Sequence, residues 1–331
     1  MDDIAKVFKL VPGDKRHSPL PASRPELYSH YETQRNAFWT EKTVNFKDDY
    51  NNFLKMPMEE RNMLIMLHVL FTRADHLADN VFSTKYGLIK EAMYDLNLVL
   101  NYQAMMENIH EIGYERALQM LVGDDKALLD KIHAEFDSYT LIANLYRWVD
   151  KYTNCEKAQD FPRAILAMAL FEGVLFSGAF AIILFYADKL KGVGDLNKYI
   201  ARDEGKHHTT SFILYSYLHS SYRLSPDTAR TMVSEFVNAI REFFYSIIPR
   251  NVHVIYYENV IRYIEYMADY TLVSMGYEKL YRAEQPFSHM EVYAHPIIAN
   301  LHERKSQSYT MATDSVELNN PSTLGRRPQK K

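Results

Sequence analysis

The chain has 331 residues, of which 47% are hydrophobic and 24% are charged, so it can bury a sizeable core and is typical of a soluble globular protein. Its formal net charge of -4 gives no reason to expect nucleic acid or an anionic membrane as a partner. The single cysteine, Cys155, excludes an internal disulfide and fits a reducing, cytoplasmic compartment, and the first residues, MDDIAKVFKL, lack the apolar region of a signal peptide.

Three segments follow from the distribution of prolines and polar residues. Residues 1–30 carry four prolines and are predicted to form an extended arm that is not helical. Residues 31–304 are predicted to form one folded domain, and residues 305–331 turn polar and are predicted to be a flexible tail. Glycine is scarce, and no proline lies between Pro57 and Pro162, which predicts long helices.

In the first half of the domain, residues 31–53 are predicted to form a short helix and a turn. A helix then begins at Pro57 and carries an apolar stripe on which Asp75 also falls. After a break at residues 86–87, a long helix is predicted over residues 89–122, with Gly123 as its C-terminal cap. Residues 125–153 are predicted to form one or two further helices.

In the second half, residues 164–186 are almost wholly apolar and long enough to cross a bilayer. Glu172 lies inside this stretch and no second span accompanies it, so we interpret it as the buried central helix of a bundle. A glycine-containing turn is predicted at residues 191–195, followed by helices over residues 196–218, 226–244 and 255–275.

Two copies of the pattern Glu-x-x-His carry the strongest chemical signal. Glu107 and His110 lie one turn apart on the long helix, and Tyr114 follows one turn later on the same face. Glu204 and His207 repeat the pattern about a hundred residues later. Either copy alone is a weak signal, but two copies on separate helices are what a four-helix bundle needs to hold a pair of metal ions.

Two further helices must each add a carboxylate, and Asp75 and Glu172 are the acidic residues on apolar stripes that can do so. Carboxylate oxygens with one imidazole per metal suit iron or manganese better than zinc. Four ionised carboxylates also balance the charge of two divalent ions. An empty cluster of this kind would have raised carboxylate pKa values or an unstable core.

The sequence resembles the small, radical-generating (beta) subunit of class I ribonucleotide reductase over residues 31–309. The motifs that carry the resemblance are FWT at 38–40, RAD ending at Asp75, ENIHEIGY at 107–114, FEGVLFSGAF at 171–180 and RDEGKH at 202–207. The resemblance implies a ferritin-like helical bundle, two iron ions per chain that react with O2, and a homodimer that works with a separate large (alpha) subunit to reduce ribonucleotides.

The resemblance also assigns roles to single positions. Asp75, Glu107 and His110 match the ligands of one metal, and Glu172, Glu204 and His207 match those of the other. Tyr114 matches the tyrosine that stores the radical. The residues that match the apolar pocket around this radical are Phe176, Phe180 and Ile200.

The family route between the metal site and the surface is matched by Trp39 and Asp203, through His110. Tyr309 matches the tail tyrosine that continues this route into the large subunit. Family tails usually end in acidic and aromatic residues, whereas this chain ends in a basic run. Docking is therefore expected to use residues 309–318, unless the terminus is altered.

Two alternatives keep the metal ligands but change the function. A dinuclear oxidase or desaturase would need a substrate channel beside the metals, and a ferritin-like iron carrier would store metal. Neither needs Trp39, Asp203 and Tyr309 as a charge-transfer route, so the sequence favours the reductase subunit.

Overall fold

The computed structural model describes residues 2–16, 18–123, 125–250 and 256–290, and within these residues it is a helical protein without β-strands. Its α-helices are α1 (Asp2–Val7), α2 (Pro25–Asn36), α3 (Asp49–Leu54), α4 (Met58–Asn80), α5 (Gly87–Ala92), α6 (Tyr94–Val122), α7 (Lys126–Asp137), α8 (Thr140–Thr153), α9 (Phe161–Leu170), α10 (Phe176–Phe185), α11 (Lys191–Ser216), α12 (Pro226–Ile247) and α13 (Tyr257–Ser274). Two π-helical segments, η2 (Val81–Lys85) and η4 (Phe171–Leu175), interrupt this series. The predicted all-α, ferritin-like class is confirmed.

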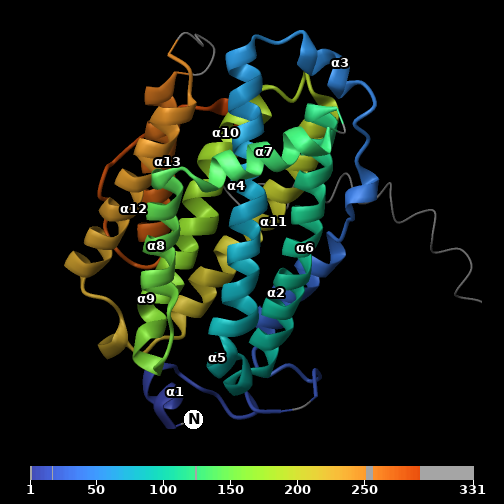
Figure 1. Cartoon of the computed structure of the whole chain (residues 1–331). Helices are drawn as coiled ribbons and strands as arrows, with labels where there is room; N and C mark the ends of the chain where they lie inside the picture. The colour runs from blue at the N-terminus through green and yellow to red at the C-terminus, as the bar shows by residue number, and fades with distance from the viewer. Residues whose placement is uncertain (1, 17, 124, 251–255, 291–331) are drawn as a thin grey trace, which may run out of the picture.

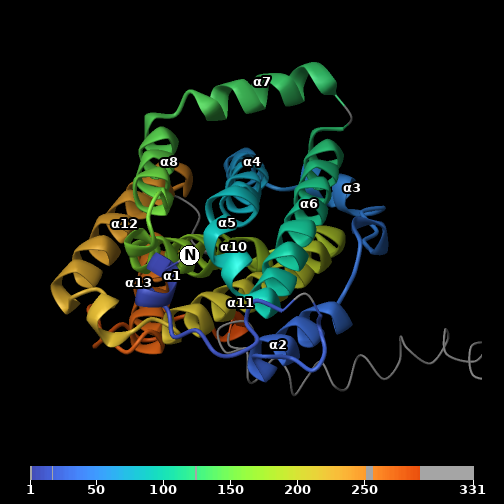
Figure 2. The same cartoon turned by 90° about the horizontal axis from the view of Figure 1, so that it is seen from below.

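The long helices run side by side as a bundle (Figure 1). Helices α4 and α6 pack against each other on one side, and α8, α12 and α13 flank the other side. The short helix α7 crosses outside α4 on its way from α6 to α8, which is clearest in the view from below (Figure 2). Between the two sides lie α11 and the continuous run of α9, η4 and α10, so these elements form the centre of the core.

The apolar stretch predicted to be a central helix is confirmed as one. A single helical run over residues 158–185 is long and apolar enough to span a membrane, and 89% of its most apolar window is buried inside the protein. Nine of the ten residues of α9 are buried, and Arg163 is the exposed one. The bundle therefore covers this helix with protein, as expected for a core helix that carries the acidic residue Glu172.

Several predicted helix ends agree with the structure. Gly123 ends α6 in the left-handed conformation, with φ +76°, which glycine adopts without steric cost. Asp125 caps α7 by accepting a hydrogen bond from the Leu128 amide at 3.0 Å. Residues 125–153 form two helices, one of the two predicted possibilities. The predicted helix over 89–122 is divided at Met93, which has an extended backbone between α5 and α6.

The prediction that residues 1–30 lack helix is wrong at both ends of the segment. Helix α1 forms before the first proline, and α2 begins at Pro25, where proline is well tolerated because a first-turn amide has no helical partner. Between them, Arg24 forms a buried ion pair with Asp14, with a distance of 2.8 Å from Nε to Oδ1. The Arg24 amide donates to Asp95 Oδ2 of α6 at 2.7 Å, and this contact fixes the segment to the bundle.

The predicted turn at residues 191–195 is also wrong, because α11 begins at Lys191. Its glycines serve close packing instead of a turn: a Cβ on Gly192 would lie 2.5 Å from the Asn45 carbonyl oxygen. The Asp49 carboxylate accepts a hydrogen bond from the Val193 amide at 2.7 Å and so supplies the cap. A cap that comes from a residue 144 positions away gives no local sequence signal.

Candidate metal centre

Six acidic and imidazole side chains meet in the middle of the bundle. Asp75 comes from α4, Glu107 and His110 from α6, Glu172 from η4, and Glu204 and His207 from α11. None of the six is more than 3% exposed. The structure thus brings together all six of the predicted metal ligands, with each of four neighbouring helical elements contributing at least one.

His110 faces three carboxylates with one edge of its ring. Its Nδ1 lies 3.1 Å from Glu107 Oε2, 3.1 Å from Glu204 Oε1 and 3.8 Å from Asp75 Oδ2. The Glu107 contact follows from the i, i+3 spacing on one helix, whereas the Glu204 contact joins α6 to α11.

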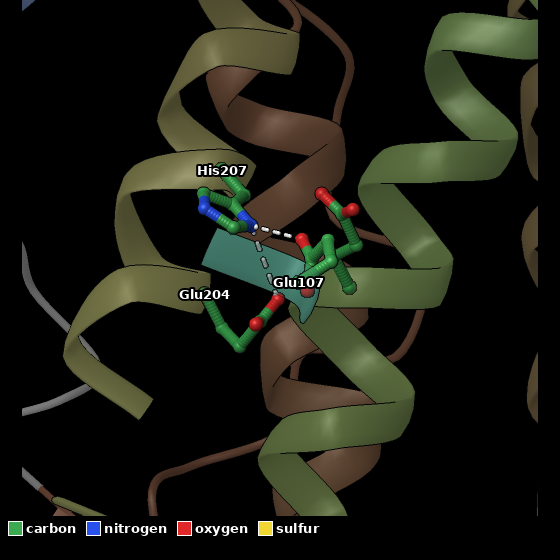
Figure 3. Close-up of side chains that lie close together, drawn as sticks. Glu107, Glu204 and His207 are labelled. Atoms are coloured by element: carbon green, nitrogen blue, oxygen red, sulfur yellow. Dashed lines mark ion pairs between the residues drawn. The ribbon is translucent and has the colours of Figure 1, made fainter. Parts of the chain in front are cut away.

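His207 occupies the equivalent position on the other side of the cluster. Its Nδ1 lies 2.8 Å from Glu107 Oε1 and 3.6 Å from Glu204 Oε2, as the dashed lines in Figure 3 show. The two imidazole rings are nearly parallel, with centroids 6.0 Å apart. Glu107 and Glu204 therefore stand between the two histidines, and each points one oxygen towards each ring.

The donor atoms form two overlapping groups that could each hold a metal ion. One group contains Asp75, Glu107 and His110, and the other contains Glu107, Glu172, Glu204 and His207. Within each group the ligand atoms lie within 4.8 Å of one another. Glu107 belongs to both groups, a shared position that the spacing in the sequence did not reveal.

The carboxylates of Asp75 and Glu172, called the outer carboxylates below, have oxygens that are free to bind a metal. Among the residues that the structure describes, both oxygens of Asp75 and both oxygens of Glu172 are buried without a hydrogen-bond partner. Buried acceptors of this kind are costly unless something neutralises them. Hard oxygen ligands together with two imidazoles suit a pair of divalent first-row metal ions. The residues of this cluster therefore fit a dinuclear metal centre.

The pKa values of the outer carboxyl groups reflect the same surroundings. Burial, reinforced by repulsion from Glu107 and Glu204, raises the pKa of Asp75 well above its usual value. Burial also raises the pKa of Glu172 well above its usual value, and the same two carboxylates add repulsion. In the metal-free protein ionisation of both carboxyl groups is therefore disfavoured.

The pKa values of Glu107, His110 and His207, by contrast, are shifted so that the charged form of each group is favoured. Burial disfavours the Glu107 carboxylate, but its contacts with His207 and His110 outweigh this and lower the pKa to about 2. Burial likewise opposes a charge on either imidazole, yet the surrounding carboxylates raise the pKa of both His110 and His207 well above the usual value. Without metal, protonated imidazoles thus take the place of cations in the cluster.

Glu172 lies on the π-helical segment η4, where the helix is locally widened. The next residue, Gly173, packs against the ring of His208, and a Cβ at this glycine would lie 2.2 Å from that ring. His208 Nε2 lies 3.0 Å from Thr271 Oγ1, whose own proton is donated to the Met267 carbonyl. His208 is therefore the donor in this contact, which fixes its tautomer.

A small cavity of about 20 Å³ adjoins this second half of the cluster. Glu172, Glu204, Ser177, His208 and Tyr270 supply its polar lining. A space of this size admits a molecule about as large as water.

Tyr114 lies fully buried next to the first half of the cluster. Its ring stacks on Phe71, with centroids 4.7 Å apart and planes 11° apart, and the His68 ring meets it edge-on at 6.1 Å. Burial, with a smaller contribution from the negative charge of Asp75, raises the pKa of the Tyr114 phenol well above its usual value. The phenol is therefore held in its protonated form in a dry environment.

The three residues predicted to form an apolar pocket are all buried. The Phe176 and Phe180 rings contact Phe71 at 5.3 Å and 4.8 Å, so they reach the Tyr114 ring through Phe71. Ile200 lies on α11 and is fully buried. Phe71 was not predicted as part of this pocket, although its position one turn before Asp75 could have indicated it.

The predicted charge-transfer residues also come together. Trp39 Nε1 donates to Asp203 Oδ2 at 2.7 Å, and the same oxygen lies 3.4 Å from His110 Nε2. The Trp39 and His110 rings are nearly parallel, with centroids 5.9 Å apart. Burial opposes the Asp203 charge, but His110, Lys206 and Arg202 outweigh it and hold the carboxyl pKa below its usual value. Tyr309 lies outside the described residues.

This fold and this site define a class. A bundle whose four central elements supply four carboxylates and two histidines is a ferritin-like protein built for a dinuclear metal centre.

The family model for "Ribonucleotide reductase, small chain" matches residues 16–286. The chain therefore belongs to the small-chain family of ribonucleotide reductase, and the predicted enzyme class, the small subunit of ribonucleoside-diphosphate reductase, is confirmed. The relatives support the same family. The chain is 26% identical over 296 residues to "Ribonucleoside-diphosphate reductase small chain" of Plasmodium falciparum (isolate Dd2), which covers 89% of this chain and 83% of that protein.

Solved structures show the same fold at low sequence identity. The ribonucleotide reductase Rnr4 homodimer from Saccharomyces cerevisiae aligns with a TM-score of 0.75 and 22% identity, covering 89% of this chain and 90% of that chain. The dimanganese(II)-NrdF protein from Streptococcus sanguinis aligns with a TM-score of 0.68 and 19% identity, covering 86% of this chain and 98% of that chain.

Proposed function

We propose that the six clustered side chains bind two iron ions per chain and that Tyr114 stores the radical which the large subunit uses to reduce ribonucleotides. The observation that carries this proposal is the burial of Tyr114 beside an unpartnered Asp75 carboxylate in a carboxylate and histidine cluster. Two metal ions held in this cluster would activate O2, which supplies the oxidising equivalents. Manganese, which the Streptococcus sanguinis protein holds, is the alternative metal.

The protein's own residues do the remaining work. Glu107 and Glu204 each reach both histidines, so these four side chains would hold the metal ions together. The Phe71 ring, backed by Phe176 and Phe180, covers Tyr114 and excludes water and reductants from the oxidised phenol. The cavity beside Glu172 is of a size that suits a molecule such as O2.

Trp39 and Asp203 connect this interior to the surface. The Asp203 carboxylate accepts the indole proton of Trp39 in a hydrogen bond at 2.7 Å, so the proton can move to Asp203 when an electron leaves the ring. Arg202 and Lys206 lie 3.3 Å and 3.4 Å from the other oxygen and keep Asp203 ionised and ready to accept. We propose that the tail, residues 305–331, continues the route through Tyr309 and docks on the large subunit.

A second copy of the chain is the proposed partner of α6. The outer face of this helix exposes Met105 and Ile112, with 42% and 50% of each residue accessible. Asn101 and Asn108 share the face at helical spacing, so the stripe is mixed and suited to contact with another protein. The yeast relative is a homodimer. Sedimentation of the full chain tests this proposal, and a monomer would contradict it.

We also infer a cytoplasmic location.

The decisive experiment compares the wild-type chain with Tyr114→Phe after Fe(II) and air are added to metal-free protein. We expect both proteins to bind two irons, and only the wild type to show a tyrosyl signal in electron paramagnetic resonance and to support reduction with the large subunit. An active Tyr114→Phe reductase would place the radical elsewhere. A wild type without a radical under any metal condition would favour the desaturase or iron-carrier alternative.

A further inference from the structure

Trp39 has a second aromatic neighbour that the transfer route does not include. The Tyr199 ring lies 5.2 Å from the Trp39 ring between centroids, with the planes 20° apart. This is closer than the 5.9 Å that separates Trp39 from His110. Trp39 is thus nearly parallel to two rings, one belonging to the metal cluster and one outside it.

Helix α11 fixes the position of Tyr199. Tyr199, Arg202 and Asp203 stand at i, i+3 and i+4, so they share one face of the helix. The Arg202 guanidinium lies 5.5 Å from the centroid of the Tyr199 ring and donates to the Ala37 carbonyl at 2.5 Å. Asp203, next in sequence, accepts the Trp39 indole proton. The same turn of helix therefore holds both the indole N–H and the ring that stacks on it.

Exposure increases along the three rings. His110 is fully buried, Trp39 is 5% exposed, and Tyr199 is partly exposed. Aromatic rings in near contact exchange electrons more readily than rings separated by aliphatic side chains. The stack is therefore a continuous aromatic path from the metal cluster to the solvent.

We propose that Tyr199 is a redox-active residue through which an electron from a one-electron reductant in solution reaches Trp39. The inference rests on the proposed function, which supplies oxidised Trp39. Tyr199 gives one electron to the oxidised indole and releases its phenolic proton to water, while the indole proton returns from Asp203 to Nε1. Trp39 is thereby restored and Tyr199 becomes a neutral phenoxyl radical. The reductant then returns one electron, water returns the proton, and Tyr199 is restored. Arg202 favours the neutral radical because a cation beside the ring opposes a second positive charge.

The experiment generates oxidised Trp39 with light and does not depend on the metals. A ruthenium polypyridyl photo-oxidant is attached to the full chain at Phe38→Cys, in a Cys155→Ser background, because Phe38 is 52% exposed and adjoins Trp39 in sequence. After a flash with an electron-accepting quencher, we expect the tryptophanyl absorption to give way to tyrosyl absorption. Tyr199→Phe keeps the ring stack but has no phenolic proton to lose, so its tryptophanyl signal should persist and the tyrosyl signal should be lost.

The second tryptophan supplies a matched control. Tyr152 lies 4.8 Å from Trp148 between ring centroids, on α8, and Tyr152→Phe should change neither signal. Equal tyrosyl yields in Tyr199→Phe and the parent protein would overturn the inference. If the parent protein shows the conversion but forms no radical with iron and O2, the inference stands and the proposed function fails. If it is an active reductase but shows no conversion, the inference alone fails.

Discussion

Asp75, Glu107 and His110 come from two regular helices, α4 and α6, whereas Glu172 in the other half of the cluster comes from the π-helical segment η4. The two halves have similar donors, yet their surroundings differ. The α4 and α6 half adjoins Tyr114 and connects through His110 to Asp203 and Trp39, and the η4 and α11 half adjoins the small cavity. We infer that the first half handles the radical and the second half admits small molecules.

The largest expected effect comes from Glu204, a residue of the second half that contacts the histidines of both halves. Glu204 lies 3.1 Å from His110 and 3.6 Å from His207, so Glu204→Ala should abolish stoichiometric binding of two irons per chain. Helical content should remain, because bundle packing provides most of the helix stability. Iron analysis and circular dichroism measure the two outcomes. Glu111→Ala, which removes a carboxylate next to His110 in sequence, is the control, and full iron loading of Glu204→Ala would contradict the assignment.

Trp39→Phe changes only the first half. The phenyl ring stays apolar but is smaller and cannot donate to Asp203, so the unfolding free energy should fall by about 1–3 kcal/mol. Iron binding and the Tyr114 signal should persist while reductase activity with the large subunit collapses, because Asp203 loses the indole proton it would accept. Trp148→Phe, on α8, should leave activity intact. Normal turnover of Trp39→Phe would show that the indole only fills space.

Gly173→Ala changes only the second half. The new methyl group would lie 2.2 Å from the His208 ring, and overpacking of this kind costs about 1–3 kcal/mol. Gly205→Ala is the matched control, because a Cβ there meets nothing within 4 Å, and it should stabilise α11 by about 0.5–1 kcal/mol. Urea unfolding of metal-free protein measures both. Unchanged stability in Gly173→Ala would mean that His208 moves aside at little cost.

The smallest expected effect concerns a property that both halves share, a buried carboxyl group with a raised pKa. In the metal-free chain the pKa values of Asp75 and Glu172 are raised from 3.8 and 4.5, so the folded protein loses stability as the pH rises above these values. Asp75→Asn and Glu172→Gln should each stabilise metal-free protein at pH 7 by about 1 kcal/mol or more. The gain should disappear as the pH falls to about 4 and below, where the carboxyl groups of the unfolded chain are protonated as well. Urea midpoints at both pH values measure this, and a loss of stability at pH 7 would contradict the raised pKa values.

The metal cluster was predictable because its spacing is local. A Glu and a His three residues apart share a helix face whatever surrounds them, and Asp75 and Glu172 were visible as acidic residues on apolar stripes. The sharing of Glu107 between both donor groups could not be predicted, since it depends on how α6 and α11 face each other. The same applies to Tyr199, whose ring meets Trp39 across 160 positions of sequence.

In the fold, too, features with a local sequence pattern were predictable and features that depend on distant contacts were not. Core helices with long apolar periodicity were predicted, and Gly123 marked an end correctly. The start of α11 was missed because its glycines read as a turn, although they allow close contact with residue 45, and because its cap is the distant Asp49. The π-helical segment at residues 171–175 left no pattern of its own, since every residue in it is buried.

The buried helical run over residues 158–185 also constrains how the chain is made. Helices α4 and α6 leave the ribosome before it and can cover one side at once, but α11, α12 and α13 follow it in the sequence. At a translation rate of about 5–20 residues per second, the side of this helix that the later helices cover stays exposed to solvent for roughly 5 to 20 s. During this interval the nascent chain exposes an apolar surface, which is prone to aggregation until the later helices pack against it.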